Sequence, residues 1–366
     1  MNKRIGTLTS IAVLLAVTML FGGVARADEW INLFDNETLF GWTAVGDAQW
    51  QVAEKDLVCE NGAGGWLAST SQFTDFELVV KMRVAADGSA GLVVRAGLDG
   101  HPSETGGATI LLKEPKGSTP DWREITVTAD GDKVTAKMDG KDVEVLGGGK
   151  RGHIGFQYHR KGKVEIASAR LRPLNAKPIF NGKDLEGWNV IPGHKSEFKV
   201  VDGAINIKNG NGQIETAGTY KDFVLQLDIF SNGDHLNSGV FYRGSVGVFW
   251  KGYECQVRNQ WQGDDRTKPV DFGTGGNYGN QAARKVVSSD REWFTLTIVC
   301  DGNHAAVWNN GYLVSDYLDS RPVSPAPESN GKEGYVTGPG TINLQGHDPT
   351  TDLSFKNIRV LEYPAK

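Results

Sequence analysis

A carboxylate and an amide alternate within one short apolar run of the chain. In the run YECQV, residues 253–257, the two-residue period of a β-strand places Glu254 and Gln256 on one face. Side by side on the open face of a sheet, the two groups can bind sugar hydroxyls, and the carboxylate can also act as a base. The alternative is an exposed strand face that carries ordinary polar residues.

A histidine with the same alternation lies near the end of the chain. Gln345 and His347 share one face of the run INLQGH, and histidine is the usual acid/base group near neutral pH. Gln157 and His159 form the same pair in the first half of the chain. A packed, hydrogen-bonded histidine is therefore as well supported as a site residue.

An arginine ends the run GVFYR at residues 239–243, and another ends the related run GLVVR at residues 91–95. Arg243 can bind a substrate oxygen that gathers negative charge. Its occurrence in both runs supports the alternative, in which it ties a loop or a sheet edge in place. Asn237 precedes the run only in the second half of the chain.

Aromatic residues gather in or near a long excursion that follows Arg243: Trp250, Tyr253, Trp261 and Tyr278. Aromatic rings that stack on the apolar face of a pyranose are a common sugar-binding device. Tryptophans in a sandwich core are the simpler explanation. We expect Trp188 and Trp293 in the core and Trp261 at the site.

These residues belong to the second of two related copies. LFDNETLFGW at 33–42 matches IFNGKDLEGW at 179–188, and GLVVR matches GVFYR. The offset is 188 − 42 = 146 at the first landmark and 243 − 95 = 148 at the second, which indicates two related domains. In the first copy the run GATILL puts Thr109 at the position of the carboxylate and Leu111 at that of the amide, so that copy has lost its acid.

The elements that must position these side chains are strands. The apolar runs are short, alternate with polar residues, and end at Gly, Asn or Asp. This pattern predicts an all-β protein of two tandem jelly-roll β-sandwiches. We expect a degenerate domain at 28–174 and a domain with the site at 175–366.

The second domain has longer loops than the first. Between the arginine and the next shared tryptophan it has 293 − 243 = 50 residues, against 122 − 95 = 27 in the first copy. A Pro-, Ser- and Gly-rich stretch at 320–340 predicts a long loop, and loops of this length are usually functional or mobile.

Composition and charge restrict the partners. The chain has 366 residues, of which 23% are charged, with a net charge of −5 and a pI of about 5.9. It has no basic run that would hold a phosphate backbone, which argues against nucleic acid as a partner.

The first 27 residues predict a cleavable signal peptide. Lys3 and Arg4 precede a mostly apolar stretch at 11–24, which is short for a membrane span, and an A-x-A site at 25–27 precedes Asp28. An uncleaved anchor fits less well because of the cleavage site. We expect the mature protein in the periplasm or secreted, with no membrane association beyond the signal peptide.

Cysteine and histidine spacing indicates no zinc site. The three cysteines, Cys59, Cys255 and Cys300, leave at least one thiol unpaired. One disulfide is possible, but small buried apolar side chains are the better interpretation. The sequence indicates no cofactor and leaves a divalent-metal requirement open.

Taken together, the motifs of the second copy resemble the 3-keto-disaccharide hydrolase domain family. The resemblance is carried by IFNGKDLEGW, DFVLQLDIF, NSGVFYR, GYECQ, EWF and INLQGHDPTTDLSFKNIRV, which span the whole second domain. The first copy is similar more weakly, through its GW, DFELVVKMRV and FQYH. The resemblance implies a concanavalin A-like jelly roll and action on glycosides already oxidised to a ketone at C3.

The implied chemistry is an elimination. A C3 ketone acidifies the hydrogen at C2, a base removes it, and the C1 substituent leaves from the enolate. Addition of water then gives net hydrolysis. Such a site needs a base, a group that stabilises the enolate oxygen, and an acid for the leaving group.

The resemblance gives each site residue an expected role. The catalytic candidates are Glu254 as base or sugar ligand, Arg243 as oxyanion stabiliser, and His347 as acid or second base. The substrate-binding candidates, which orient hydroxyls or stack on the sugar, are Gln256, Asn237, Gln345, Trp261 and Tyr278.

One departure from the family separates two functions. Relatives often carry an aspartate shortly after the E-x-Q pair, where this chain has Arg258 and Asn259. Asp271 or Asp265 is then the substitute, or the protein binds sugars without cleaving them. A lectin-like pair of sandwiches is the main alternative, and a scaffold protein is a third. The two-carboxylate scheme of ordinary glycosidases fits less well because the motifs hold one carboxylate.

Overall fold

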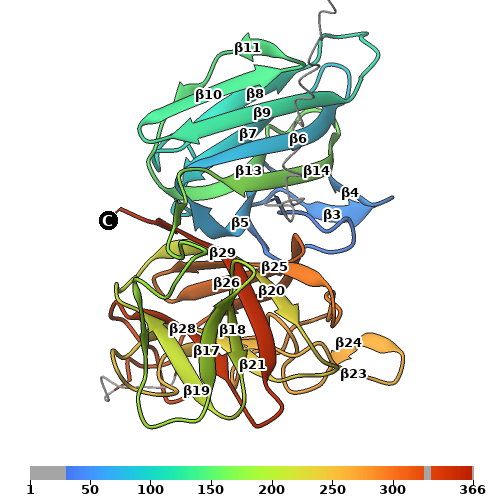
Figure 1. The fold of residues 1–366 in the computed structure, drawn as a ribbon. Helices are drawn as coiled ribbons and strands as arrows, with labels where there is room; N and C mark the ends of the chain where they lie inside the picture. Colours follow the sequence, from blue (N-terminus) through green and yellow to red (C-terminus); the bar gives the residue numbers. More distant parts are fainter. Residues whose placement is uncertain (1–29, 325–330, 365–366) are drawn as a thin grey trace, which may run out of the picture.

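The computed structural model describes residues 30–324 and 331–364, and its strands form two β-sandwiches in tandem (Figure 1). All pairings between the named strands are antiparallel, and the described residues contain no helix, which confirms the predicted all-β jelly-roll class. The predicted signal peptide lies outside the described residues. None of the described segments is a helix long and apolar enough to span a membrane.

Strands β1–β14 make the first sandwich, the blue-to-green lobe of Figure 1. One sheet has the order β11 (Lys141–Val143), β10 (Lys133–Met138), β9 (Arg123–Asp130), β6 (Phe76–Val84), β14 (Val164–Pro173), β4 (Asp56–Cys59), β3 (Trp50–Ala53), and β1 (Ile31–Asn32) pairs with β14. The other has the order β12 (Leu146–Gly147), β8 (Ala108–Lys113), β7 (Ser89–Ala96), β13 (Gly152–Tyr158), β5 (Gly65–Phe73), β2 (Trp42–Gly46).

Strands β15–β29 make the second sandwich and a small hairpin. Its larger sheet has the order β17 (Glu197–Val201), β18 (Ala204–Lys208), β29 (Asp352–Glu362), β20 (Phe223–Ser231), β25 (Trp293–Asp301), β26 (His304–Asn309), β27 (Tyr312–Leu318), and β15 (Lys177–Pro178) pairs with β29. The smaller sheet, called the site sheet below, has the order β16 (Trp188–Val190), β19 (Gly212–Thr216), β28 (Thr341–Gly346), β21 (Ser238–Gly244), β22 (Tyr253–Val257). The hairpin is β23 (Trp261–Gln262) with β24 (Asp265–Pro269).

Strand alternation puts one apolar row of each sheet into a core between the layers. In β20 this row consists of Phe223, Leu225, Leu227 and Ile229, all of them buried. All three cysteines are buried and unpaired, as expected of small apolar side chains. Burial of apolar surface of this kind is the main force that holds the layers together.

One of the two tryptophans expected in the core is not there. Trp188 is buried, whereas Trp293 is 39% exposed. Trp293 begins β25, where Phe294, Leu296 and Ile298 occupy the core face, so alternation turns it to the other face. There the Lys356 ammonium lies 3.8 Å from the centre of its ring.

The two sandwiches share packed and charged contacts. The core cluster of the first continues into Trp308 and Tyr363 of the second. Between the lobes, Arg151 is paired with Asp222 and Asp301, and Arg284 with Asp35. Because several of these groups are buried, the interface holds the lobes in one arrangement.

Candidate functional site

Strand register brings two rows of polar side chains together on the site sheet. Gln213 pairs with Gln345 and Glu215 with Asn343 across β19 and β28. Across β21 and β22, Gly239 pairs with Gln256, and Phe241 with Glu254. The intervening residues, among them Val240, Leu344 and Cys255, belong to the core, so both polar rows face away from it.

The first copy keeps the register and loses the chemistry. Gly91 pairs with Leu111, and Val93 with Thr109, across β7 and β8. Thr109 therefore stands where the second copy has Glu254, and Leu111 where it has Gln256, as predicted. Only the second sandwich has a carboxylate at this place.

The outward polar row opens into a pocket of about 170 Å³. Its lining consists of Asn211, Asn237, Phe249, Trp250, Glu254, Gln256, Tyr278, Gln345 and His347. Six residues predicted from the sequence to belong to the site thus line one cavity. They come from β22, β28 and loops, among them the loop before β21, and these segments are far apart in sequence.

Glu254 is the buried acid of this pocket. Only 5% of its surface is exposed, and burial raises the pKa of its carboxyl group to about 7. A hydrogen bond from the Trp250 side chain and the charge of Lys332 act in the opposite direction, and Asp271 adds to the increase in the pKa. At neutral pH both forms of the carboxyl group are populated, which suits a group that accepts and returns a proton.

Gly239 leaves the space that this carboxylate occupies. A Cβ atom at residue 239 would lie 2.6 Å from Glu254 Oε1 and 2.9 Å from its Cγ. The glycine is therefore required by the close approach of the acid from the neighbouring strand. The equivalent Gly91 lies under Thr109 and Gln157 instead.

Asp271 holds the amides beside Glu254. Its Oδ2 accepts hydrogen bonds from Asn237 Nδ2 at 3.0 Å, from Gln256 Nε2 at 3.1 Å and from Arg258 at 3.2 Å. Of the two aspartates considered as substitutes for the family's acid, Asp271 is the one in contact with pocket residues. Asp265 lies in the small hairpin, where it accepts hydrogen bonds from Thr267.

Asn259 belongs to a buried structural network. Its side-chain oxygen accepts from Thr274 Oγ1 at 2.7 Å and Ser288 Oγ at 2.5 Å, and its amide donates to Asp290 at 3.1 Å. It is 2% exposed and is not part of the pocket lining. The family's aspartate position thus carries a residue that joins loops in this chain.

Several buried polar atoms on this face have no partner within the described structure. They are Gln345 Oε1, Asn237 Oδ1, Gln213 Nε2 and Asn343 Nδ2. Two of these atoms, Gln345 Oε1 and Asn237 Oδ1, belong to residues that line the pocket. Buried polar groups in native proteins are nearly always hydrogen-bonded, so these two acceptors point to a polar ligand.

His347 lies at the mouth of the pocket. Its side chain is 45% exposed, and its Nδ1 lies 3.1 Å from Asp348 Oδ2. That contact occupies one ring nitrogen and leaves Nε2 available to a ligand.

Arg243 does not line the pocket, contrary to the role predicted for it. Its guanidinium donates to the backbone carbonyls of Lys221 and Val336 and is paired with Asp222 at 3.1 Å. The side chain is almost fully buried, and Arg243 adopts a positive φ of 53° at an irregularity in β21, which turns it away from the open face. Of the two roles considered, tying a loop and an edge in place is the one that the structure shows.

Arg95 repeats this arrangement in the first copy. It also adopts a positive φ, of 58°, and donates to the carbonyl of Thr74 and to Asp75. The arginine that both copies retain is thus structural: in each copy its guanidinium joins backbone carbonyls and an aspartate of neighbouring segments, an arrangement called the arginine clasp.

Trp261 also lies outside the pocket lining. It sits in the small hairpin, where the Arg266 guanidinium lies 4.1 Å from the centre of its ring. The stacked arginine occupies one aromatic face, so that face is not open to a sugar.

Sequence reasoning missed a lysine next to the pocket. The Lys332 ammonium lies 3.8 Å from the ring centre of Tyr278 and 4.7 Å from that of Trp250, and both rings line the pocket. Its pKa lies below the ordinary value for lysine because burial lowers it by more than the charges of Glu254 and Asp271 raise it. Its only sequence signal was its position in the Pro-, Ser- and Gly-rich loop.

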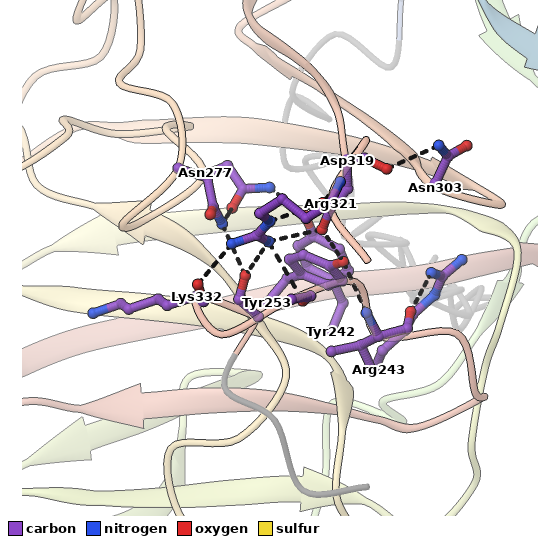
Figure 2. Close-up of polar contacts among 12 residues, drawn as sticks. Tyr242, Arg243, Tyr253, Asn277, Asn303, Asp319, Arg321 and Lys332 are labelled. Carbon is purple, nitrogen blue, oxygen red and sulfur yellow. Dashed lines mark hydrogen bonds and ion pairs between the residues drawn. The ribbon is translucent and has the colours of Figure 1, made fainter. Parts of the chain in front are cut away.

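A polar clamp fixes the backbone that carries Lys332, as Figure 2 shows. Arg321 donates to the carbonyls of Gly331 and Lys332 and is paired with Asp319 at 2.7 Å. Asp319 in turn accepts from the hydroxyl of Tyr253 at 2.6 Å. In the figure the Lys332 side chain points away from this clamp.

Metal-ligating side chains do not converge in the part of the chain that the structure describes. No group of three or more His, Cys, Asp or Glu residues is placed there to hold an ion.

Several solved structures are similar to one sandwich of this chain. Two are proposed glycosyl hydrolases from Parabacteroides distasonis: one is 21% identical, covers 52% of this chain and 94% of its own, and has a TM-score of 0.41. The other is 23% identical, covers 52% of this chain and 100% of its own, and has a TM-score of 0.42. A carbohydrate-binding module from Bacillus subtilis is 16% identical over 49% of this chain and 97% of its own, with a TM-score of 0.34. The comparison with curated proteins gave no match.

The family comparison covers nearly all of the described chain. The 3-keto-alpha-glucoside-1,2-lyase-like domain matches residues 29–172 and again residues 175–361. Two matches in tandem agree with the two copies read from the sequence and with the two sandwiches of the structure. The chain belongs to the family of 3-keto-alpha-glucoside-1,2-lyase-like domains and contains two copies of that domain.

Proposed function

We propose that the second sandwich cleaves 3-keto-glycosides by removing the C2 proton and eliminating the C1 substituent. The observation that carries this proposal is the buried Glu254, whose pKa is about 7, in a pocket lined by amides. Family membership supplies the substrate class. A carbohydrate-related function follows from the family alone, and the mechanism is the proposed part.

Glu254 is the base of the proposed reaction. Its carboxylate takes the proton from C2, and the electrons of the C2–H bond move into an enolate whose negative charge lies on the C3 oxygen. The unpaired amide atoms of Asn237 and Gln345 hydrogen-bond the sugar hydroxyls. The charge of Lys332 near Glu254 favours the enolate, a role that Arg243 cannot fill from its buried position.

The enolate then expels the leaving group. The carbonyl at C3 re-forms, a C1=C2 double bond appears, and the C1–O bond breaks. His347, at the mouth of the pocket, donates the proton that the departing oxygen needs. Water that adds across C1=C2 converts this elimination into net hydrolysis.

The test is cleavage of 4-nitrophenyl 3-keto-α-glucopyranoside beside its unoxidised parent by the chain from Asp28. We expect release from the keto substrate alone, loss of about 10³-fold in kcat for Glu254→Gln, and smaller losses for His347→Ala and Lys332→Met. His159→Ala, the matching histidine of the first copy, is the control and should keep full activity. Deuterium at C2 of recovered substrate, from reactions in D₂O, separates proton removal from loss of the leaving group.

The second candidate function is carbohydrate binding without cleavage, which the unpaired amides of the pocket also support. Sugar binding without release of 4-nitrophenol and without deuterium exchange at C2 would favour this second function. Equal release from the oxidised and unoxidised substrates would point to an ordinary glycosidase and overturn the elimination.

The proposal places the reaction outside the cytoplasm. Its basis is the signal-like sequence of residues 1–27, with A-x-A before Asp28. Cell fractionation with N-terminal sequencing tests it: we expect protein that begins at Asp28 in the periplasm or the medium, and recovery in the cytoplasm alone with Met1 intact would contradict it.

A further inference from the structure

The first sandwich has a pocket of its own at the place of the site in the second. It is lined by Val45, Gly46, Asp47, Gly65, Trp66, His101, Pro102, Gln157, His159 and neighbouring residues. Gln157 pairs with Gly91 on one side and Trp66 on the other, as Gln345 pairs with Gln213 in the second copy. The degenerate copy has therefore kept the cavity although it has lost the acid.

The two pockets differ in size. The pocket of the first sandwich measures about 610 Å³, against about 170 Å³ in the second. Cavities that bind small molecules typically measure about 300–1,000 Å³. In the second sandwich, Trp250 and Phe249 crowd the mouth, and the first copy has His101 at the position of Phe249, at the offset of 148 that relates Arg95 to Arg243.

The polar groups of the first pocket include one amide and two imidazoles, and Asp47 and Arg160 also belong to its lining. The buried amide of Gln157 lies 2.5 Å from His101 Nε2, and His159 Nδ1 lies 3.0 Å from Ser89 Oγ. Burial lowers the pKa of His159, which favours the uncharged imidazole. The buried indole N–H of Trp66 has no hydrogen-bond partner among the described residues.

These groups suit sugar hydroxyls, and the position that corresponds to Glu254 carries no carboxylate. Imidazole and amide groups can both form hydrogen bonds with hydroxyls. The indole of Trp66, with Val45 and Pro102, supplies apolar surface for the carbon face of a sugar ring. Thr109 replaces the carboxylate, so no group stands where the base of the second sandwich lies.

We propose that the pocket of the first sandwich is a second saccharide site, which binds an unoxidised glucoside unit and does not cleave it. The sugar class of the ligand rests on the proposed function of the second sandwich. The place of the site, and the absence of a carboxylate at the position of Glu254, rest on the geometry of the first sandwich alone. The protein would then hold a glycan by one copy and cleave oxidised units with the other.

The test uses the two-domain chain from Asp28 with Glu254→Gln, which removes the proposed base from the pocket of the second sandwich. Binding of methyl α-D-glucopyranoside and maltotetraose is followed by saturation-transfer NMR and titration calorimetry. Gln157→Leu and His101→Phe should each weaken binding about tenfold. His101→Phe copies the residue of the second sandwich and lies on an exposed loop, so it tests the site without endangering the fold. Gln345→Leu is the matched control and should leave this binding unchanged.

The outcomes keep the two proposals apart. The proposal of a saccharide site in the first sandwich is overturned if Gln345→Leu abolishes sugar binding and Gln157→Leu does not. It is also overturned if no form of the protein binds either sugar. In the chain with Glu254 intact, His101→Phe should leave kcat/KM on the chromogenic keto substrate within about twofold. If the keto substrate is never cleaved while His101→Phe still weakens glucoside binding, the reaction fails and the second site stands.

Discussion

At the scale of single residues, burial gives Glu254 its chemistry. A surface glutamate would be fully ionised at neutral pH and a weak base, whereas this one, 5% exposed, has a pKa of about 7. A base whose pKa lies near the working pH is the most effective proton acceptor that is still present in its ionised form. The same burial lowers the free energy of unfolding when the carboxyl group is ionised, because the buried charge has lost its contact with water.

The pH profile of the reaction should report this carboxyl group. Only the ionised form accepts a proton, so kcat/KM on the keto substrate is expected to rise as the pH increases from 5 to about 7 and then to level off. The measurement is a series of initial rates at constant ionic strength. A profile that is already flat from pH 5 would show that Glu254 is not the base.

Glu254→Gln should make the protein inactive and also more stable at high pH. The folded-state pKa is raised from 4.5 to about 7, so between these values the unfolded chain binds fewer protons than the native one, and native stability falls as pH rises. Glutamine avoids this loss, and the variant should be more stable than the wild type by about 3 kcal/mol at pH 8, and by much less at pH 4.5. Urea unfolding at both pH values measures it. A constant difference between variant and wild type would contradict the assignment.

Gly239→Ala should misplace the acid without unfolding the sandwich. The added Cβ would meet Glu254 Oε1 at 2.6 Å, so the carboxylate must move, and displacements of about 1 Å can cost about 10²-fold in rate. Gly91→Ala is the matched control in the first copy, where the Cβ would meet Thr109 and Gln157 at 3.0 and 3.1 Å. We expect kcat to fall only in the first variant, with both melting temperatures close to the wild type. Equal effects of the two variants would argue against a special role for Gly239.

At the scale of elements, the loop that follows β27 brings a lysine next to the pocket. It contributes Lys332, whose backbone is held by Arg321, and Arg321 is fixed by Asp319 at the end of β27. Arginine suits this place because its planar fork binds two carbonyls and a carboxylate at once. The described backbone at Gly331 and Lys332 is thus held by hydrogen bonds, although the composition of the loop is typical of mobile segments.

Arg321→Lys should reduce activity through Lys332. Lysine cannot span the carbonyls of Gly331 and Lys332 together with Asp319, so the loop should loosen, amide exchange at 331–336 should quicken, and kcat/KM should fall about tenfold. The double variant Arg321→Lys with Lys332→Met tests whether Arg321 affects the rate through Lys332. If the clamp acts by placing Lys332, then Arg321→Lys should cost little more in that background. Additive losses would assign the clamp another role.

At the scale of the whole molecule, the duplication divides two tasks between related sandwiches. Both keep the arginine clasp, the glycine of the central strand and the Gln–x–His pair, because these belong to the fold or to the cavity. Only the second has the carboxylate and the longer loops that narrow the pocket. The two lobes meet through buried groups, among them Trp308 and Tyr363.

The sandwiches should therefore unfold together. Trp308 is 2% exposed, donates its indole N–H to the carbonyl of Asn32 at 3.0 Å and packs against Phe73 of the other lobe. Trp308→Ala should cost about 3–5 kcal/mol and separate one calorimetric transition into two. Two transitions in the wild type would show instead that the lobes are independent.

The sequence by itself determined the fold class, the duplication and most of the pocket. Strand alternation and the repeat were enough to place Glu254 with Gln256, and Gln345 with His347, on outward faces, because the period of a strand is local and fixed. The comparison of the two copies also located Thr109 in place of the acid. These inferences needed only the order of residues along single strands.

Only the tertiary structure decided which polar residues meet. Arg243 stands in a strand next to the site, yet an irregularity and a positive φ turn it into a buried clasp. Lys332 lies beside the pocket residue Tyr278 and comes from a loop that no periodic pattern describes. Asp271, which contacts the pocket residue Gln256, comes from the long excursion. The pKa of Glu254 depends on burial by segments that close over it. Such contacts are set by loop closure and packing between distant segments, and neither leaves a local signal in the sequence.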